Sequence, residues 1–153
     1  MRNTVLTILF IALTLLQLSC HPYRDRELEQ RLTKALIEFK NSDAPYLDLN
    51  PIFGRNWEKI CVQVAYQSKE QFENLVGRPV RGFNSASETF NVFWVLYPDG
   101  TAKWARVYSV SVMGEYYGIG ASCTSIEHPR LYARVWTGRG AYPAERRYFF
   151  LNN

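Results

Sequence analysis

The chain has 153 residues, of which 47% are hydrophobic and 21% are charged, and its formal net charge at neutral pH is +4. This length allows one domain with a real hydrophobic core. The net positive charge is mild and the sequence has no dense block of Lys or Arg, which argues against a nucleic-acid-binding protein.

The first twenty residues have the anatomy of a secretory signal. Arg2 precedes an apolar run from Val5 to Leu16, and the small Ser19 stands directly before Cys20. A run of about twelve apolar residues is too short to cross a bilayer of roughly 30 Å as a helix. A buried N-terminal helix is the alternative, but this run has no polar face. We therefore expect residues 1–19 to be a signal peptide.

The end of this segment, Leu16-Gln17-Leu18-Ser19-Cys20, resembles the lipobox of bacterial lipoproteins. The resemblance implies cleavage before Cys20 and attachment of acyl chains to that cysteine, which would hold a soluble domain on a membrane. Cleavage elsewhere with free secretion is the alternative. In this family, an Asp directly after the cysteine retains the lipoprotein in the inner membrane. This chain has His21 at that position, so the resemblance implies the periplasmic face of the outer membrane.

Two cysteines, Cys61 and Cys123, remain beyond Cys20. An even pair in an oxidising compartment most often forms a disulfide, and we predict that bond here. A metal site or a thiol nucleophile is the competing interpretation. His128 is the only other strong metal ligand beyond the anchor region, so we expect no metal site and no cofactor.

The polar residues 20–26 are predicted to form a short tether, followed by one domain over residues 27–153. Apolar residues then recur at spacings of three and four, which predicts an amphipathic helix over about 26–40. We expect its apolar stripe to pack on its own domain; a partner or a membrane surface is the alternative. Residues 41–56 are predicted to be a connector. The stripe consists of Leu28, Leu32, Ala35, Leu36 and Phe39.

The middle of the chain combines strand and helix signals. Apolar residues alternate over 57–66, which predicts a strand. Ser68 and Gln71 form a capping box and Gly77 ends the segment, which predicts a two-turn helix. Residues 90–97 are apolar on both faces, as expected of a central strand with both faces covered.

The remaining elements complete the fold prediction. A turn at Pro98-Asp99-Gly100 connects 90–97 to a second strand in a hairpin. Residues 113–123 fit either a strand edge or a loop, and 131–137 and 146–152 are predicted strands. The fold class is therefore α+β, with an antiparallel sheet of about five strands, the N-terminal amphipathic helix and the short helix packed on it, and one disulfide.

Residues suited to catalysis are scarce. His21 adjoins the anchor and His128 precedes a proline, and neither has a carboxylate placed to orient it by local spacing. The two G-x-G pairs lack the third glycine of a phosphate loop. The carboxylates are scattered, so a glycosidase pair could form only through the fold. The sequence predicts no catalytic residue.

Aromatic residues are abundant, at 15% of the chain. We assign Phe90, Phe93, Trp94 and Phe150 to the core because they lie in apolar strands. Many tyrosines lie among arginines, in sequence between 106 and 148, and these residue types dominate protein-binding hot spots. A solvated strand face is the alternative.

One strand makes this prediction specific. Tyr132, Arg134 and Trp136 share one side of it, while Leu131, Ala133, Val135 and Thr137 share the other. The second side is more uniformly small and aliphatic and should face the core. The first side is our candidate partner-binding surface.

The segments Trp57-Glu58-Lys59-Ile60-Cys61 and Ile126-Glu127-His128-Pro129-Arg130 resemble small enterobacterial-type lipoproteins in which a W-x-K-[IV]-C strand opens the domain. The resemblance implies export and a disulfide, and it implies no activity. We expect a lipid-anchored envelope module that binds a protein partner without catalysis, as an assembly factor, immunity protein or inhibitor does. A periplasmic cell-wall hydrolase is the alternative.

Overall fold

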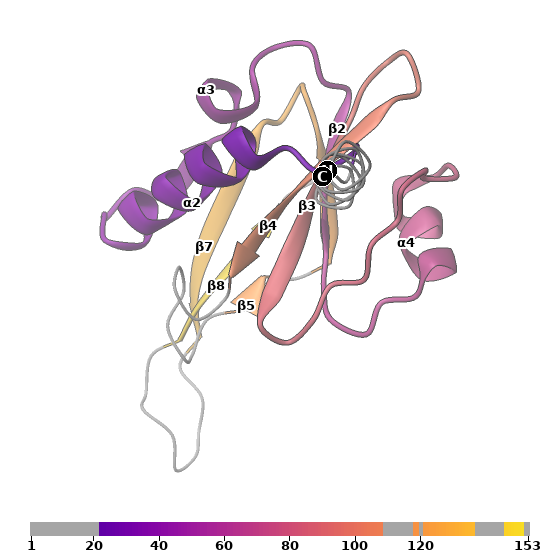
Figure 1. Ribbon diagram of the computed structural model, residues 1–153. Helices are drawn as coiled ribbons and strands as arrows, with labels where there is room; N and C mark the ends of the chain where they lie inside the picture. The colour runs from indigo at the N-terminus through magenta and orange to yellow at the C-terminus, as the bar shows by residue number, and fades with distance from the viewer. Residues whose placement is uncertain (1–21, 109–117, 120, 137–145, 152–153) are drawn as a thin grey trace, which may run out of the picture.

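The computed structural model describes residues 22–108, 118–119, 121–136 and 146–151. The predicted signal peptide and Cys20 lie outside these residues. The described chain forms two four-stranded sheets and three helices (Figure 1). The helices are α2 (Arg26–Lys40), α3 (Asn50–Phe53) and α4 (Lys69–Val76). Among the described residues, no helix is long and apolar enough to cross a membrane.

The strands divide into two groups of four. Sheet A has the order β4-β3-β2-β6 and sheet B the order β1-β7-β8-β5. Sheet A consists of β2 (Lys59–Gln63), β3 (Phe90–Leu96), β4 (Ala102–Tyr108) and β6 (Ser122–Ser125). Sheet B consists of β1 (Tyr46–Asp48), β5 (Gly118–Ile119), β7 (Arg130–Trp136) and β8 (Arg146–Leu151).

The α+β class is confirmed, but the prediction of one sheet of about five strands is wrong. The last two predicted strands, β7 and β8, pair with each other and with two short strands, β1 and β5. Strand β5 lies in 113–123, the segment that fitted either a strand edge or a loop. Strand β1 was not predicted, because it has three residues in the predicted connector and is too short for alternation to be visible. The pairing of β5 with β8 is parallel, and the other pairings are antiparallel.

Helix α2 has the bounds that the sequence predicted. The side chain of Asp25 caps its N-terminus by accepting a hydrogen bond from the backbone N–H of Leu28 at 2.9 Å. Leu28, Leu32, Leu36 and Phe39 of its stripe are buried and Ala35 is half-buried against the same core. The helix contacts β4, α3 and β1. The stripe therefore packs on its own domain, as expected.

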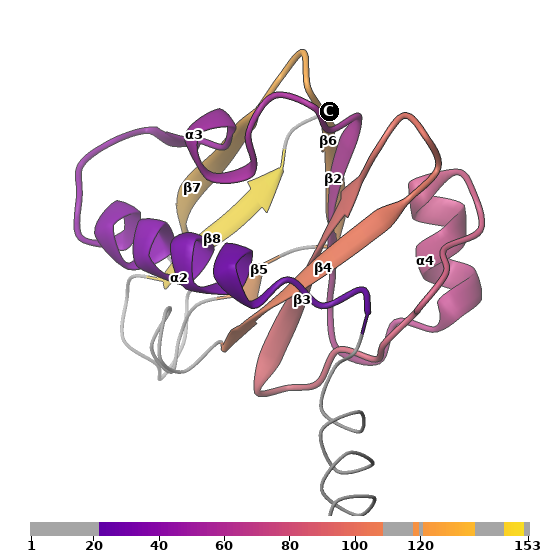
Figure 2. The ribbon, with the colours of Figure 1, turned by 45° about the horizontal axis from the view of Figure 1, so that its top comes forward.

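Sheet A separates two hydrophobic cores, in agreement with the prediction that 90–97 is covered on both faces (Figure 2). The first core lies between α2, α3 and both sheets and contains Trp57, Phe93 and Phe149. The second lies between sheet A and α4 and contains Phe72, Trp94 and Trp104. Successive residues of β3 point to opposite faces, so each core takes alternate residues of this strand.

Helix α4 is held at both ends by the residues that predicted it. Ser68 and Gln71 form both bonds of the capping box, and Gly77 ends the helix in the left-handed conformation with a φ of 86°. The ammonium group of Lys59 on β2 also donates to the backbone oxygen of Val76 at 2.9 Å. This bond fixes the helix C-terminus to sheet A.

The predicted disulfide between Cys61 and Cys123 is present. The two residues are direct partners on the neighbouring strands β2 and β6, with Cα atoms 4.0 Å apart and an S–S distance of 2.01 Å. Both side chains are buried under α4. The bond therefore fastens β6, an edge strand of sheet A, to the centre of the sheet.

The described part of the predicted tether joins the domain at Tyr23. The backbone oxygen of Tyr23 accepts from the N–H of Trp104 at 2.8 Å, and the N–H of Asp25 donates to the oxygen of Trp104 at 2.9 Å. Arg24 lies between them and makes a two-pronged ion pair with Glu29, with distances of 2.7 and 3.0 Å. The chain thus enters the fold along the edge strand β4.

Candidate functional site

The outer face of sheet B carries a row of aromatic rings across three strands. Tyr132 of β7 lies opposite Tyr46 of β1 on one side and opposite Phe150 of β8 on the other. The ring centroids are 6.0 Å apart in the first pair and 5.7 Å in the second. We call Tyr46, Tyr132 and Phe150 the aromatic row. Their chain neighbours Leu47, Leu131, Phe149 and Leu151 belong to the first core, so the row faces outward.

A cation lies on this row. The guanidinium carbon of Arg130 lies 4.3 Å from the centroid of the Tyr46 ring, within the range of a cation–π contact. The pKa of Arg130 is raised, first by a hydrogen bond with the Tyr132 side chain and next by the electrostatic interaction with Tyr46. The surface therefore presents flat aromatic rings and an exposed cation side by side.

The predicted binding residues lie on β7, and the structure describes them in part. Leu131 is fully buried and Ala133 packs against the core, while Tyr132 lies on the other side of the strand, as expected. The backbones of Arg134 and Trp136 pair with Tyr148 and Arg146 of β8. The side chains of Arg134 and Trp136 lie outside the described residues, so their part in this surface stays a prediction.

Two members of the aromatic row were missed by sequence reasoning. Tyr46 lies in the predicted connector and joins the row only because β1 pairs with β7. Phe150 was assigned to the core, which is wrong: Phe149 is the buried residue, and Phe150 stacks on Tyr132 with an angle of 22° between the rings. Two adjacent phenylalanines give no alternation signal, but the buried Leu151 after them could have indicated the register.

The tyrosines and arginines of the sequence do not share one surface. Arg106 and Tyr108 belong to β4 of sheet A, where the guanidinium of Arg106 lies 4.7 Å from the centroid of the Phe90 ring. The Phe90 ring is 5.9 Å from that of Tyr108. The sequence could not separate the two groups because it did not reveal that the fold has two sheets.

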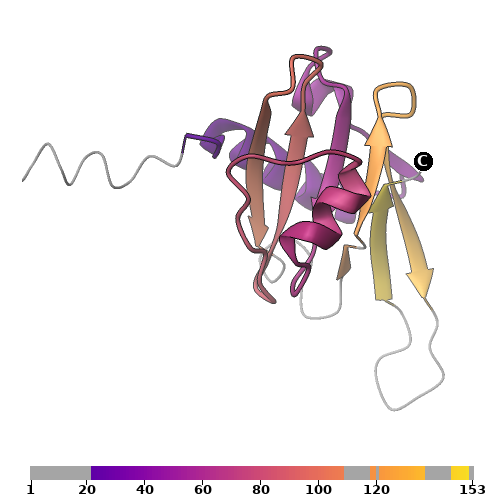
Figure 3. The same cartoon turned by 90° about the vertical axis from the view of Figure 1, so that its right-hand side faces the viewer.

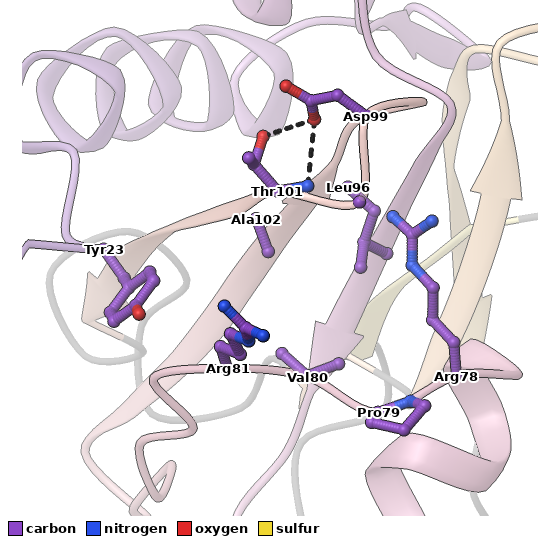
Figure 4. Close-up of a pocket in the computed structure, with 10 residues that line it drawn as sticks. Tyr23, Arg78, Pro79, Val80, Arg81, Leu96, Asp99, Thr101 and Ala102 are labelled. Atoms are coloured by element: carbon purple, nitrogen blue, oxygen red, sulfur yellow. Dashed lines mark hydrogen bonds between the residues drawn. The ribbon is translucent and has the colours of Figure 1, made fainter.

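A second candidate site is a pocket of about 470 Å³ beside the point where the chain enters the fold (Figure 4). We call it the entry pocket. Tyr23 forms one wall, the segment after α4 forms another, and the turn between β3 and β4 closes the third. It is lined by Tyr23, Arg78, Pro79, Val80, Arg81, Leu96, Asp99, Gly100, Thr101 and Ala102.

Two arginines and one aspartate are among the residues that line the entry pocket, and the Asp99 carboxylate is turned toward Thr101 (Figure 4). Arg78 is fixed by Glu58 at 3.1 Å and by the backbone oxygen of Tyr97 at 3.0 Å. Arg81 is exposed and makes no ion pair with a described residue. One oxygen of Asp99 accepts from the hydroxyl and the N–H of Thr101, at 2.6 and 2.9 Å. These hydrogen bonds, the hydroxyl first, lower the pKa of Asp99 and keep it ionised.

His128, the histidine that the sequence offers for proton transfer, lies in a hydrogen-bonded turn. It is exposed in the turn between β6 and β7, where its backbone N–H donates to the oxygen of Ser125 at 3.1 Å. Its own backbone oxygen accepts from the hydroxyl of Thr124 at 2.5 Å. Within the described part of the chain, no group of three or more His, Cys, Asp or Glu side chains could hold a metal ion.

Comparison with known proteins gives no relative: no protein-family model matches the chain, and neither the curated proteins nor the solved structures contain a significant match.

Proposed function

We propose that this chain is a lipid-anchored binding module of the bacterial envelope that holds a protein partner and catalyses no reaction. In this proposal residues 1–19 are the signal peptide and Cys20 carries the acyl chains. The domain stands on the periplasmic face of the outer membrane. The partner binds the outer face of sheet B, at the aromatic row together with Arg134 and Trp136 of β7.

The observation that carries the proposal is the aromatic row with its cation. Tyr46 is exposed and Tyr132 and Phe150 are half-buried, and rings that already pack on one another lose little conformational freedom when a partner covers them. Tyr, Trp and Arg are also the residues most enriched at the energetic centres of protein interfaces. Stacked rings beside the guanidinium of Arg130 fit a partner that offers an apolar patch next to a carboxylate.

The position of sheet B in the fold supports the same proposal. Tyr23 enters along β4 at one edge of sheet A, and sheet B lies beyond the opposite edge, past β6 (Figure 3). A domain anchored through Cys20 would therefore have its outer sheet B face far from the anchored edge. A partner could then reach this face without displacing the anchor.

No specific observation favours the alternative function, a cell-wall hydrolase. A glycosidase usually acts with two carboxyl groups that flank the bond to be cleaved. Of the described residues that line the entry pocket, Asp99 is the one with a carboxylate. We therefore develop the binding proposal.

The proposal is tested by crosslinking the protein in its own envelope, identifying the captured partner by mass spectrometry, and measuring its Kd for purified variants. Tyr132→Ala, Arg134→Ala and Trp136→Ala should each weaken binding by more than about 1 kcal/mol. Tyr66→Ala is the matched control, because Tyr66 is 83% exposed and lies outside sheet B. It should bind as the wild type does.

The melting temperature of each variant separates binding from folding. If Arg134→Ala or Trp136→Ala lowers the melting temperature by roughly 10 °C while the folded protein still binds, that side of β7 belongs to the core. Equal loss of binding in the Tyr66→Ala control would place the partner elsewhere. Either result would overturn the proposed surface.

A further inference from the structure

Strand β1 stands at one end of sheet B and has a free edge. Among the described strands, β7 is its one hydrogen-bonded neighbour. The residues along this edge are exposed: they include Tyr46 and Asp48 of the strand and residues 43–45 before it. The edge of a sheet presents unpaired N–H and C=O groups, to which a further strand can be added.

The register of β1 with β7 shows which backbone groups point to the free edge. The N–H of Leu49 donates to the backbone oxygen of Pro129 at 2.8 Å, and this pair continues the register of the two strands. Hydrogen-bonded residues in an antiparallel pair alternate with residues whose N–H and C=O point away from the partner strand. Leu47 therefore also bonds to β7, whereas the backbone groups of Tyr46 and Asp48 point outward. Within the described part of the chain, no backbone hydrogen bond joins these outward groups to another segment.

A second copy of β1 can pair with all of these groups in one two-fold register. Tyr46 opposite Tyr46 would also need Ala44, whose N–H is already bonded to the Ser42 hydroxyl at 3.3 Å. Asp48 opposite Asp48 would need Asn50, whose N–H is bonded to the Asp48 carboxylate at 3.0 Å. It would also bring like charges face to face. Tyr46 opposite Asp48 is the register in which both residues pair fully in both copies.

The charges on the outer face fit this register. Asp48 and Arg130 lie opposite each other on β1 and β7, yet no ion pair joins them. The guanidinium of Arg130 lies over the Tyr46 ring instead, with its carbon 4.3 Å from the ring centroid. Beyond Tyr46, in this register, lies Asp48 of the second copy. The two-fold axis repeats the arrangement, so a cation approaches a carboxylate on both sides of the junction.

We propose that a second copy of this chain adds its β1 to the free edge of β1, antiparallel and about a two-fold axis at Leu47. The two B sheets then form one continuous sheet, on which the two aromatic rows lie side by side. Strands of three residues bury less than the roughly 1,200–2,000 Å² of a stable interface, so the association is weak in dilute solution. The inference goes beyond the proposed function and does not depend on it.

The first test is disulfide crosslinking between two variants of the full chain, Tyr46→Cys and Asp48→Cys. Opposite residues of a hydrogen-bonded pair have Cα atoms about 5.5 Å apart, which suits a disulfide, whereas diagonal neighbours are roughly 7–8 Å apart. At high protein concentration with a mild oxidant, the mixture should form crosslinked dimer at least about tenfold faster than either variant alone. Arg130→Cys mixed with Tyr132→Cys is the matched control, because these residues have the same spacing on the inner strand β7. This control mixture should show no such gain.

The second test measures self-association by sedimentation equilibrium. Asp48→Arg and Arg130→Asp should each weaken it at least about fivefold, because like charges then meet across the junction. Mixing these two variants restores opposite charges across the junction and leaves the charges within each copy mismatched, so the mixture should associate at least as tightly as the wild type. Arg55→Asp is the control, since Arg55 is exposed and lies outside sheet B, and it should associate as the wild type does.

Equal crosslinking rates in the mixture and in the single variants would overturn the inference, as would a wild type that stays monomeric at every concentration. If the two cysteine variants, made together in the envelope, crosslink to another protein and not to each other, the edge belongs to a strand of that protein and the inference is wrong. Each of these results would leave the proposed partner surface standing, because its test measures the Kd of the partner itself.

Discussion

Gly82 illustrates how a single residue positions the start of the domain. Its backbone has a positive φ that side chains rarely adopt, and the Tyr23 ring occupies the space where a Cβ would stand. Gly100, in the turn between β3 and β4, also has a positive φ, of 83°, but among the described residues no atom beyond its two chain neighbours lies within 4 Å of where its Cβ would stand. Comparing alanine substitutions at Gly82 and Gly100 therefore distinguishes the cost of backbone strain from the cost of the contact with Tyr23.

Replacing each glycine by alanine should measure that contact. Gly100→Ala should cost about 1–2 kcal/mol of unfolding free energy through its left-handed backbone alone. Gly82→Ala should cost at least about 1 kcal/mol more, because the methyl group must also displace the Tyr23 ring. Urea denaturation of the two variants checks this difference.

A double variant provides the control for this explanation. In a Tyr23→Ala background, Gly82→Ala should lose its excess cost, since the ring is no longer there to be displaced. Equal destabilisation by both glycine substitutions in the wild-type background would show that Tyr23 is not held against Gly82.

At the scale of elements, the disulfide decides how strongly β6 is fastened. Strand β6 is four residues long and pairs with β2 on one side. The bond between Cys61 and Cys123 closes a loop with a sequence separation of 62. Closing such a loop removes conformations from the unfolded chain, and the chain-entropy model gives about 4 kcal/mol for it.

Reduction of the disulfide should therefore lower the free energy of unfolding by about 4 kcal/mol, measured by urea denaturation with and without reductant. The double variant Cys61→Ala and Cys123→Ala should be destabilised to a similar extent and should not respond to reductant. Two free thiols in the denatured, unreduced wild type would contradict the bond itself.

The same scale shows what could be predicted from the sequence. Helix α2 was predicted from the spacing of its apolar stripe, and helix α4 because Ser68, Gln71 and Gly77 mark its ends by local chemistry. The β3–β4 hairpin was predicted for the same reason, from its turn at Pro98-Asp99-Gly100. Strand β1 could not be predicted, because a strand of three residues has no visible period. Strand β5 has two residues and lies in 113–123, where the sequence left a strand edge and a loop as alternatives.

The candidate site was likewise predictable only in part. Alternation along β7 placed Leu131 and Tyr132 on opposite sides correctly. The aromatic row and the entry pocket depend on contacts between segments far apart in sequence, such as Tyr46 with Tyr132 and Tyr23 with Gly82. Spacing within one segment contains no information about such pairs.

At the scale of the whole molecule, the proposed function gives the domain two ends with different roles. The edge strand β4 receives Tyr23 and would face the membrane. The outer face of sheet B, with its aromatic row, would face the periplasm. Sheet A and its two cores lie between them. This arrangement depends on an anchor at Cys20.

Intact-mass analysis of the protein purified from the membrane fraction tests that anchor most directly. We expect the mature wild-type chain to begin at Cys20 and to carry acyl chains, and we expect Cys20→Ser to be found without acyl chains, as precursor or as soluble, mis-cleaved protein. A wild-type chain that carries no acyl group, together with a Cys20→Ser variant that fractionates with membranes as the wild type does, would contradict the anchor.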